Sequence, residues 1–197
     1  MTYELLTALA AFAFVTSITP GPNNLMLMAS GANFGFVRTV PHMLGVALGF
    51  VFMVVLVGIG LIQIFDAYPL SYTALKIFSI VYLLYLAWRI ATAAPVEKQG
   101  KAGKPFTFLQ AALFQWVNPK AWAMALTAVS VYAPSQSFLA IIQVALIFGL
   151  INFPTVGSWT VLGQQMRRFL TNPLRLRLFN ATMAVLLVAS LYPVLFP

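Results

Sequence analysis

The chain contains no cysteine and few charged residues, and both absences narrow the range of functions. Without cysteine there are no disulfides, thiolate metal ligands or thiol redox chemistry. Only 7% of the 197 residues are charged, 61% are hydrophobic, and the mean hydropathy is +0.93. A soluble domain carries about 25% charged residues. The composition therefore indicates an integral membrane protein without a sizeable soluble domain.

Acidic residues and histidine are also scarce. The three acids are Glu4, Asp66 and Glu97, none of them deep in an apolar segment, and His42 is the single histidine. This leaves little equipment for acid–base or nucleophilic catalysis. An intramembrane enzyme is therefore the least favoured function, the protein is expected not to be an enzyme, and neither a metal nor a cofactor is expected.

What the chain does contain is a series of long apolar segments. A membrane-spanning helix needs about 20 mostly apolar residues. Six segments qualify: 4–30, 39–65, 68–93, 107–132, 137–163 and 178–196. The first is expected to be a retained span, because Glu4 is its only early charge and a signal peptide needs a positive n-region.

Basic residues alternate between the connections. The first, third and fifth carry arginine or lysine, whereas the second carries Asp66 and the fourth has no charge. The positive-inside rule places the basic connections in the cytoplasm and both termini outside. The net charge of +8 is thus explained by topology. No nucleic-acid partner is expected, although such a balance on a soluble protein would suggest one.

A polar linker, 95–106, divides this single membrane domain into a first three-helix half, 1–94, and a second half, 107–197. Because three is odd, the two halves enter the membrane in opposite directions, as in an inverted repeat. The predicted fold is an all-α membrane protein with six transmembrane helices in a 3+3 inverted repeat, of which helices 1 and 4 are broken by proline.

The two breaks occupy matching places in the two halves. The first is Thr19-Pro20-Gly21-Pro22-Asn23-Asn24, and the second is Asn118-Pro119-Lys120. Proline removes a backbone N–H and clashes with the preceding turn. Irregular backbone at membrane depth survives only against protein or a water-filled cavity. Paired breaks of this kind point to the binding site of a transporter.

The breaks offer groups that suit both charges of a zwitterion. Helix N-termini suit a carboxylate, and freed carbonyls and side-chain amides suit an ammonium group. The predicted substrate-binding residues are Pro20, Gly21, Pro22, Asn23, Asn24, Asn118, Pro119 and Lys120. A cation at the depth of Lys120 costs about 2.5–3.5 kcal/mol or more. We favour a functional role for it over a structural tie to backbone carbonyls.

Four further residues are candidates for lining the site or for proton transfer: His42, Gln115, Asn152 and Pro154. Gln115 precedes the second break. Asn152 and Pro154 mark an expected third break, in the fifth apolar segment. His42 suits a proton carrier because its unperturbed pKa is about 6.5; the alternative is an ordinary interfacial residue.

These residues, with blocks elsewhere, resemble the lysine-exporter (LysE/RhtB) family of small bacterial amino-acid exporters. The blocks are Thr19-Pro20-Gly21-Pro22-Asn23, Gly35-Phe36, Gly45-Val46-Ala47-Leu48-Gly49, Tyr82-Leu83-Leu84-Tyr85-Leu86-Ala87-Trp88 and Asn118-Pro119-Lys120. The Pro-Gly-Pro-Asn-Asn form and the approach Phe114-Gln115-Trp116-Val117-Asn118 most resemble the cysteine/O-acetylserine exporter branch.

The resemblance implies a secondary exporter of neutral amino acids or derivatives across the bacterial inner membrane, driven by the proton gradient. Its expected partners are the substrate, protons and membrane lipids, and a homo-oligomer is compatible with the sequence. Asn23 stands where many members have an acid, so Lys120, His42 or the substrate would carry the proton. Ser79 and Ala184 replace customary glycines. A passive small-solute channel remains the alternative.

Overall fold

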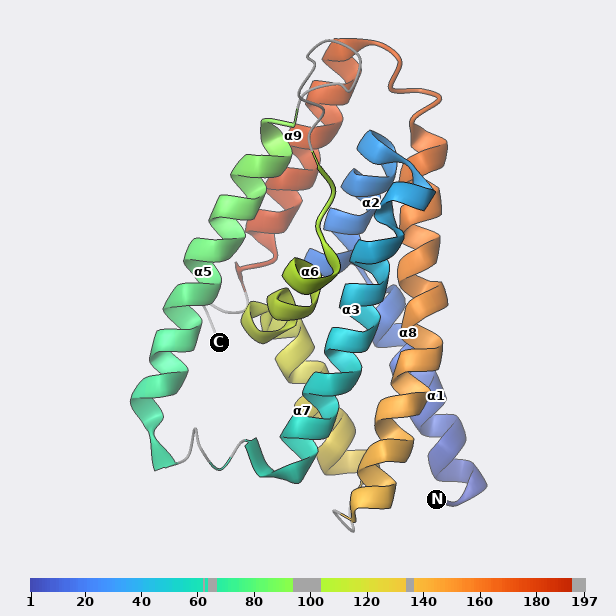
Figure 1. The fold of residues 1–197 in the computed structure, drawn as a ribbon, viewed down its shortest axis with the longest axis vertical. Coiled ribbons are helices and arrows are strands. Elements are labelled where there is room, and N and C mark those ends of the chain that lie inside the picture. The colour runs from blue at the N-terminus through green and yellow to red at the C-terminus, as the bar shows by residue number, and fades with distance from the viewer. Residues whose placement is uncertain (62, 64–66, 94–103, 134–136, 193–197) are drawn as a thin grey trace.

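The computed structural model describes residues 1–61, 63, 67–93, 104–133 and 137–192, and all regular elements in these ranges are helical (Figure 1). The helices are α1 (Tyr3–Ile18), α2 (Pro22–Phe34), α3 (Phe36–Leu56), α5 (Pro69–Ala91), α6 (Phe108–Phe114), α7 (Pro119–Tyr132), α8 (Phe138–Met166) and α9 (Pro173–Ala189). A π-helical turn, Val57–Leu61, extends α3, and a 3-10 turn, Gln115–Val117, follows α6. The expected all-α class is confirmed for this part of the chain. Asp66, Glu97 and most of the linker lie outside it.

Three continuous stretches are long and apolar enough to cross a membrane: Phe36–Leu61, Thr73–Ala91 and Phe138–Met166. The bent pair of α1 and α2 makes a fourth candidate. The expected spans 107–132 and 178–196 correspond to shorter helices. The first of these is divided between α6 and α7. The second corresponds to α9, which has 17 residues and begins at Pro173.

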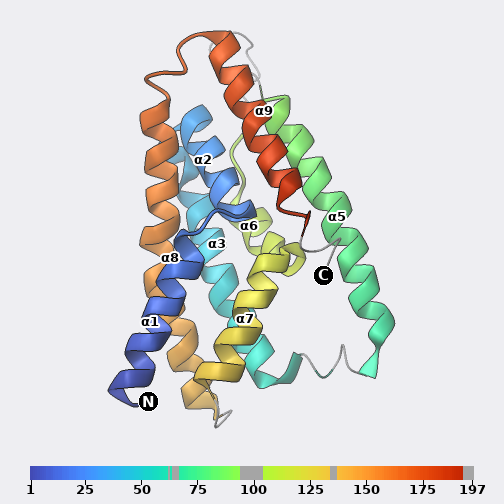
Figure 2. The same cartoon turned by 180° about the vertical axis from the view of Figure 1, so that it is seen from behind.

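The helices pack as two groups that meet at the breaks. α2 and α3 both run along α8, α1 packs on the other end of α8, and α5 pairs with α9 (Figures 1 and 2). One apolar cluster, around Phe50 and Phe148, joins α1, α3, α7 and α8. A second, around Leu83 and Leu187, joins α2, α5 and α9.

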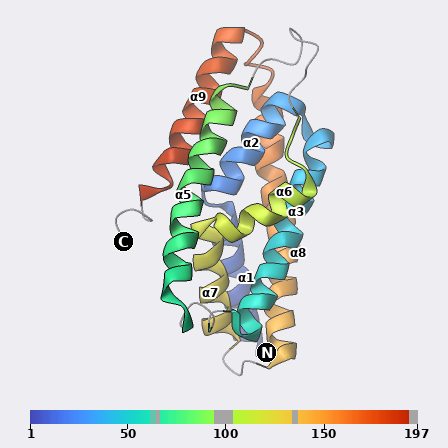
Figure 3. The ribbon, with the colours of Figure 1, turned by 60° about the vertical axis from the view of Figure 1, so that its left-hand side comes forward.

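α6 crosses α3 closely, as a view from the side shows (Figure 3). A Cβ atom at Gly45 would lie 2.3 Å from the carbonyl oxygen of Phe108, so only glycine allows this approach. The contact fixes the start of the short helix that leads to the second break.

Most of the basic residues in the described part of the chain gather at one end of the molecule; Lys76 and Lys120 lie elsewhere. Figure 1 places the α2–α3 turn, the C-terminal end of α5 and the α8–α9 connection together there, with the N-terminus at the opposite end. We call it the basic end, and its residues are Arg38, Arg89, Lys104, Arg167, Arg168, Arg175 and Arg177.

The expected third break does not occur. Pro154 lies inside α8, which continues unbroken from Phe138 to Met166. A single proline removes one backbone hydrogen bond, and in membrane helices nearby side chains and neighbouring helices compensate for it. Here α8 packs against α1, α2 and α3, and Thr155 Oγ1 donates to the carbonyl oxygen of Ile151 at 2.5 Å.

Candidate functional site

The first break is a sharp bend between two helices. α1 ends at Ile18 and α2 begins at Pro22, with an angle of 55° between them. Proline is favourable as the first residue of a helix because no hydrogen bond is needed from its nitrogen. The 16 residues of α1 span about 24 Å at 1.5 Å per residue. The bend therefore lies about 24 Å from the start of α1.

The second break follows the 3-10 turn after α6. Asn118 has an extended backbone and caps α7, because its Oδ1 accepts a hydrogen bond from the backbone nitrogen of Lys120 at 3.2 Å. Pro119 is the first residue of α7. Both breaks therefore end in a helix that starts with proline and has its N-terminus inside the protein.

Lys120 joins the two breaks. Its Nζ donates to the carbonyl oxygen of Thr19 at 2.7 Å, to Thr19 Oγ1 at 2.9 Å and to the carbonyl oxygen of Pro20 at 3.4 Å. A Cβ atom at Gly21 would lie 2.7 Å from Lys120 Cδ, so the bare glycine leaves room for the side chain. We call these three hydrogen bonds the lysine bridge.

The remaining carbonyls at the end of α1 also receive side-chain donors. Asn24 Nδ2 donates to the carbonyl oxygens of Ser17 and Thr19, each at 2.8 Å. Trp159 Nε1 donates to the carbonyl oxygen of Ile18 at 3.1 Å. The last carbonyls of a helix lack partners within it. Here α2, α7 and α8 supply them, so the C-terminus of α1 is held from three sides.

A reciprocal amide pair links the first break to α6. Asn23 Nδ2 donates to Gln115 Oε1 at 2.8 Å, and Gln115 Nε2 donates to Asn23 Oδ1 at 3.2 Å. Gln115 Nε2 also donates to the carbonyl oxygen of Ala111 at 2.8 Å. Gln115 is completely buried, so the pair gives each half of the chain a fixed contact with the other.

The breaks enclose a small polar cavity of about 30 Å³, which we call the central cavity. Two buried oxygen atoms on its wall have no hydrogen-bond partner: Ser17 Oγ, on a residue 4% exposed, and Asn152 Oδ1, on a residue 5% exposed. An unpaired buried polar atom costs about 1–3 kcal/mol. These two oxygens are therefore available to a ligand.

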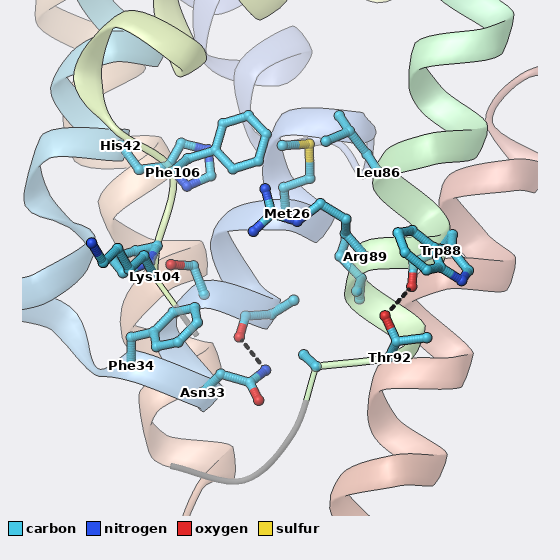
Figure 4. Close-up of a pocket in the computed structure, with 15 residues that line it drawn as sticks. Met26, Asn33, Phe34, His42, Leu86, Trp88, Arg89, Thr92, Lys104 and Phe106 are labelled. Atoms are coloured by element: carbon cyan, nitrogen blue, oxygen red, sulfur yellow. Dashed lines mark hydrogen bonds between the residues drawn. The ribbon is translucent and has the colours of Figure 1, made fainter. Parts of the chain in front are cut away.

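A larger cavity of about 340 Å³ opens toward the basic end, between α2, α5 and the segment Lys104–Phe106 (Figure 4). We call it the vestibule. Figure 4 shows Arg89 reaching from α5 toward His42 and Phe106. His42 is only 1% exposed, both of its ring nitrogens lack a partner, and its ring centroid lies 5.2 Å from that of Phe106.

The two cavities are neighbours along the same helices. On α2, Asn23 lines the central cavity and Met26 lines the vestibule. On α3, Val46 lines the central cavity and His42 lines the vestibule. Residues three or four apart in a helix lie about one turn, or 5.4 Å, apart along its axis. The linings of the two cavities are therefore about one helical turn apart along α2 and α3.

Most of the sequence-predicted site residues come together. Those that line the central cavity are Gly21, Asn23, Asn24, Gln115, Asn118, Lys120 and Asn152. Pro20, Pro22 and Pro119 shape the breaks. His42 lies in the vestibule instead, and Pro154 lies on an exposed part of α8, outside the residues that line either cavity.

Three residues outside the predicted set also take part in the site: Ser17, Thr19 and Trp159. Ser17 carries a hydroxyl in the last turn of α1 and Thr19 is the first residue of the break, so their positions in the sequence are a usable signal. Trp159 lies 141 positions from its partner Ile18, and no local pattern connects the two.

A helical membrane protein whose broken helices enclose a polar cavity has the architecture of a transporter. Residues 14–190 match the family described as LysE type translocator, and the chain belongs to this family. The resemblance inferred from the motif blocks is thereby confirmed.

Named relatives point in the same direction. The cysteine/O-acetylserine efflux proteins of Escherichia coli (strain K12) and Shigella sonnei (strain Ss046) are each 30% identical over 194 residues, covering 95% of this chain and 96% of the relative. No solved structure gives a significant match. The family and these names indicate a transporter rather than an enzyme.

Proposed function

We propose that the protein is a secondary exporter of neutral amino acids or their derivatives, including molecules like cysteine and O-acetylserine, in a bacterial inner membrane. The observation that carries this proposal is the meeting of the two proline breaks around the central cavity. The names of the relatives support the substrate class. In this account the chain crosses the membrane six times as a 3+3 inverted repeat.

The central cavity offers complementary groups for a zwitterion. The N-termini of α2 and α7 carry a partial positive charge, which suits a carboxylate. The carbonyls at the end of α1, with Ser17 Oγ and Asn152 Oδ1, suit an ammonium group. A solute with both charges close together satisfies both sets.

The sizes of the two cavities support alternating access. The central cavity, at about 30 Å³, is too small for an amino acid, whereas the vestibule, at about 340 Å³, is large enough. To admit substrate, the two breaks must separate, which breaks the lysine bridge and the Asn23–Gln115 pair. By the positive-inside rule the basic end faces the cytoplasm and both termini lie outside, so the vestibule receives substrate from the cytoplasm.

Reconstituted protein provides the test. Proteoliposomes containing the purified chain should take up radiolabelled O-acetyl-L-serine saturably, and should accumulate it above the external concentration when a proton gradient is imposed. Protein-free liposomes are the control. Flux that never exceeds the solute gradient and does not saturate would instead establish a passive channel.

A further inference from the structure

We propose that Lys120 carries the proton of this transport cycle, because its ammonium group and the ammonium group of the substrate compete for the same carbonyl oxygens. The inference rests on the proposed export of amino acids and adds to it the group that couples export to the proton gradient.

The geometry of the lysine bridge is the first reason. An ammonium group has three N–H donors, and Lys120 Nζ has three oxygen acceptors, two on Thr19 and one on Pro20. The two carbonyls belong to the C-terminus of α1, where the helix dipole favours a cation. A substrate ammonium group needs the same kind of oxygen cluster, so the protein's own side chain fills the socket when substrate is absent.

The second reason is that, among the residues the structure describes, no other titratable side chain lines the central cavity. Those on the elements packed around Lys120, within the described residues, lie toward the ends of their helices. On α1 and α7 they are Tyr3, Glu4 and Tyr132, and on α3 they are Arg38 and His42. α2, α6 and α8 carry none. His42 lines the vestibule and has no contact with the carbonyls of the first break.

The exchange proceeds in two balanced steps. When the substrate ammonium group takes the oxygens of Thr19 and Pro20, Lys120 loses its partners. Leaving a cation unpaired in a low-dielectric interior costs several kcal/mol. One N–H bond of Lys120 therefore breaks, its electron pair stays on Nζ, and the proton leaves through the vestibule. After substrate departs on the opposite side, Nζ takes a proton from that side and restores the lysine bridge.

One substrate thus leaves for each proton that enters. Because a neutral amino acid carries no net charge, each cycle moves one positive charge inward. The carrier also returns without substrate, since the protonated lysine satisfies the carbonyls at the break. Both the pH difference and the membrane potential drive export.

Two substitutions of Lys120 distinguish a role in proton transfer from a purely structural role. Lys120→Gln cannot take up a proton but can leave the socket, so its accumulation driven by a pH gradient should fall at least tenfold further than its exchange of labelled for unlabelled O-acetyl-L-serine. Lys120→Arg stays charged and should lose both. Lys76→Arg, a lysine on α5 away from the breaks, is the matched control and should retain both activities. Accumulation by Lys120→Gln at the wild-type level would overturn the proposal.

A direct proton measurement covers the case in which both Lys120 variants are inactive. Adding O-acetyl-L-serine to purified wild-type protein in weakly buffered detergent should release about one proton per bound molecule, as recorded with a pH indicator. Binding without proton release would overturn the proposal. If the wild-type protein neither binds nor exchanges the amino acid, the proposed function itself has failed, which is a separate result.

Discussion

The central cavity and the vestibule are both lined by polar side chains, but these side chains differ in their hydrogen bonding and exposure. At the central cavity, Lys120, Asn24 and the Asn23–Gln115 pair all form hydrogen bonds. Those of Lys120 and of the Asn23–Gln115 pair join segments about a hundred positions apart in the chain, whereas those of Asn24 are local. In the vestibule, which is roughly ten times larger, His42 has two unpaired nitrogens and Arg89 is exposed.

The two cavities therefore have different roles. The hydrogen bonds of the central cavity hold the breaks closed, so changes there should alter both stability and transport. The vestibule lies beside exposed side chains and solvent, where charges are screened. Changes there should affect only the capture of substrate.

The largest expected effect is at Asn24. Asn24→Leu removes both hydrogen bonds to the end of α1 and leaves the buried carbonyl of Ser17 without a donor. We expect the free energy of unfolding to fall by about 1–3 kcal/mol and uptake by proteoliposomes to fall more than tenfold. Thermal unfolding in detergent measures the first effect. Gln165→Leu, which replaces an exposed amide on α8, is the control, and an unchanged unfolding midpoint in Asn24→Leu would contradict the structural role.

A somewhat smaller effect is expected at Gly21. Gly21→Ala places a methyl group 2.7 Å from Lys120 Cδ, so the lysine side chain must move away from Thr19. Transport should fall by about tenfold while the amount of protein in the membrane is unchanged. Gly157→Ala is the matched control, because its Cβ would meet only the flexible end of Met43, at 3.3 Å. Equal transport by the two variants would show that the lysine bridge is dispensable.

Asn152 should behave differently from Asn24. Its Oδ1 has no partner in the closed cavity, so Asn152→Leu should not reduce stability. It should raise the KM for O-acetyl-L-serine by about 5–10-fold, equivalent to about 1–1.4 kcal/mol, because the substrate loses one acceptor. Concentration-dependent uptake and thermal unfolding, measured on the same preparation, separate the two effects. A lowered unfolding midpoint with an unchanged KM would assign Asn152 to structure alone.

The smallest effect is expected in the vestibule. Arg89→Gln removes a cation that attracts the substrate carboxylate, and we expect KM to rise about two- to fourfold at low salt with little change in maximal rate. The difference should disappear at about 1 M salt, where the screening length is about 3 Å. Arg175→Gln, at the same end but outside the vestibule, is the control. A large loss of maximal rate would give Arg89 a more direct role.

The positions of the two breaks could be predicted because the effect of proline is local. Their partners could not. The sequence favours a functional role for Lys120 over a structural tie to backbone carbonyls, and in the structure its Nζ donates to the carbonyl oxygen of Thr19, 101 positions earlier. The decision depends on which helix packs opposite, and that information is spread over the whole fold.

Pro154 is a second case in which the local sequence did not predict the structure, because the break expected there does not occur. Its surroundings in the sequence are similar to those of Pro119, since Pro119 directly follows Asn118 and Pro154 lies two positions after Asn152, each within an apolar segment. Yet α8 continues through Pro154, where α1, α2 and α3 hold the helix. His42 was expected near a helix start and lies there, but its burial against Phe106 follows from the segment after the linker. Packing, rather than residue type, decides both outcomes.

Because the chain contains no cysteine, a single introduced thiol can test directly whether substrate binds at the junction of the two breaks. Ser17→Cys introduces a single thiol on the wall of the central cavity, and its reaction with a small methanethiosulfonate reagent can be followed in a variant that still transports. We expect saturating O-acetyl-L-serine to slow labelling at this position at least fivefold, while labelling of Thr182→Cys, on the exposed face of α9, is unchanged. Equal labelling rates at Ser17→Cys with and without substrate would contradict a substrate site at the junction of the two breaks.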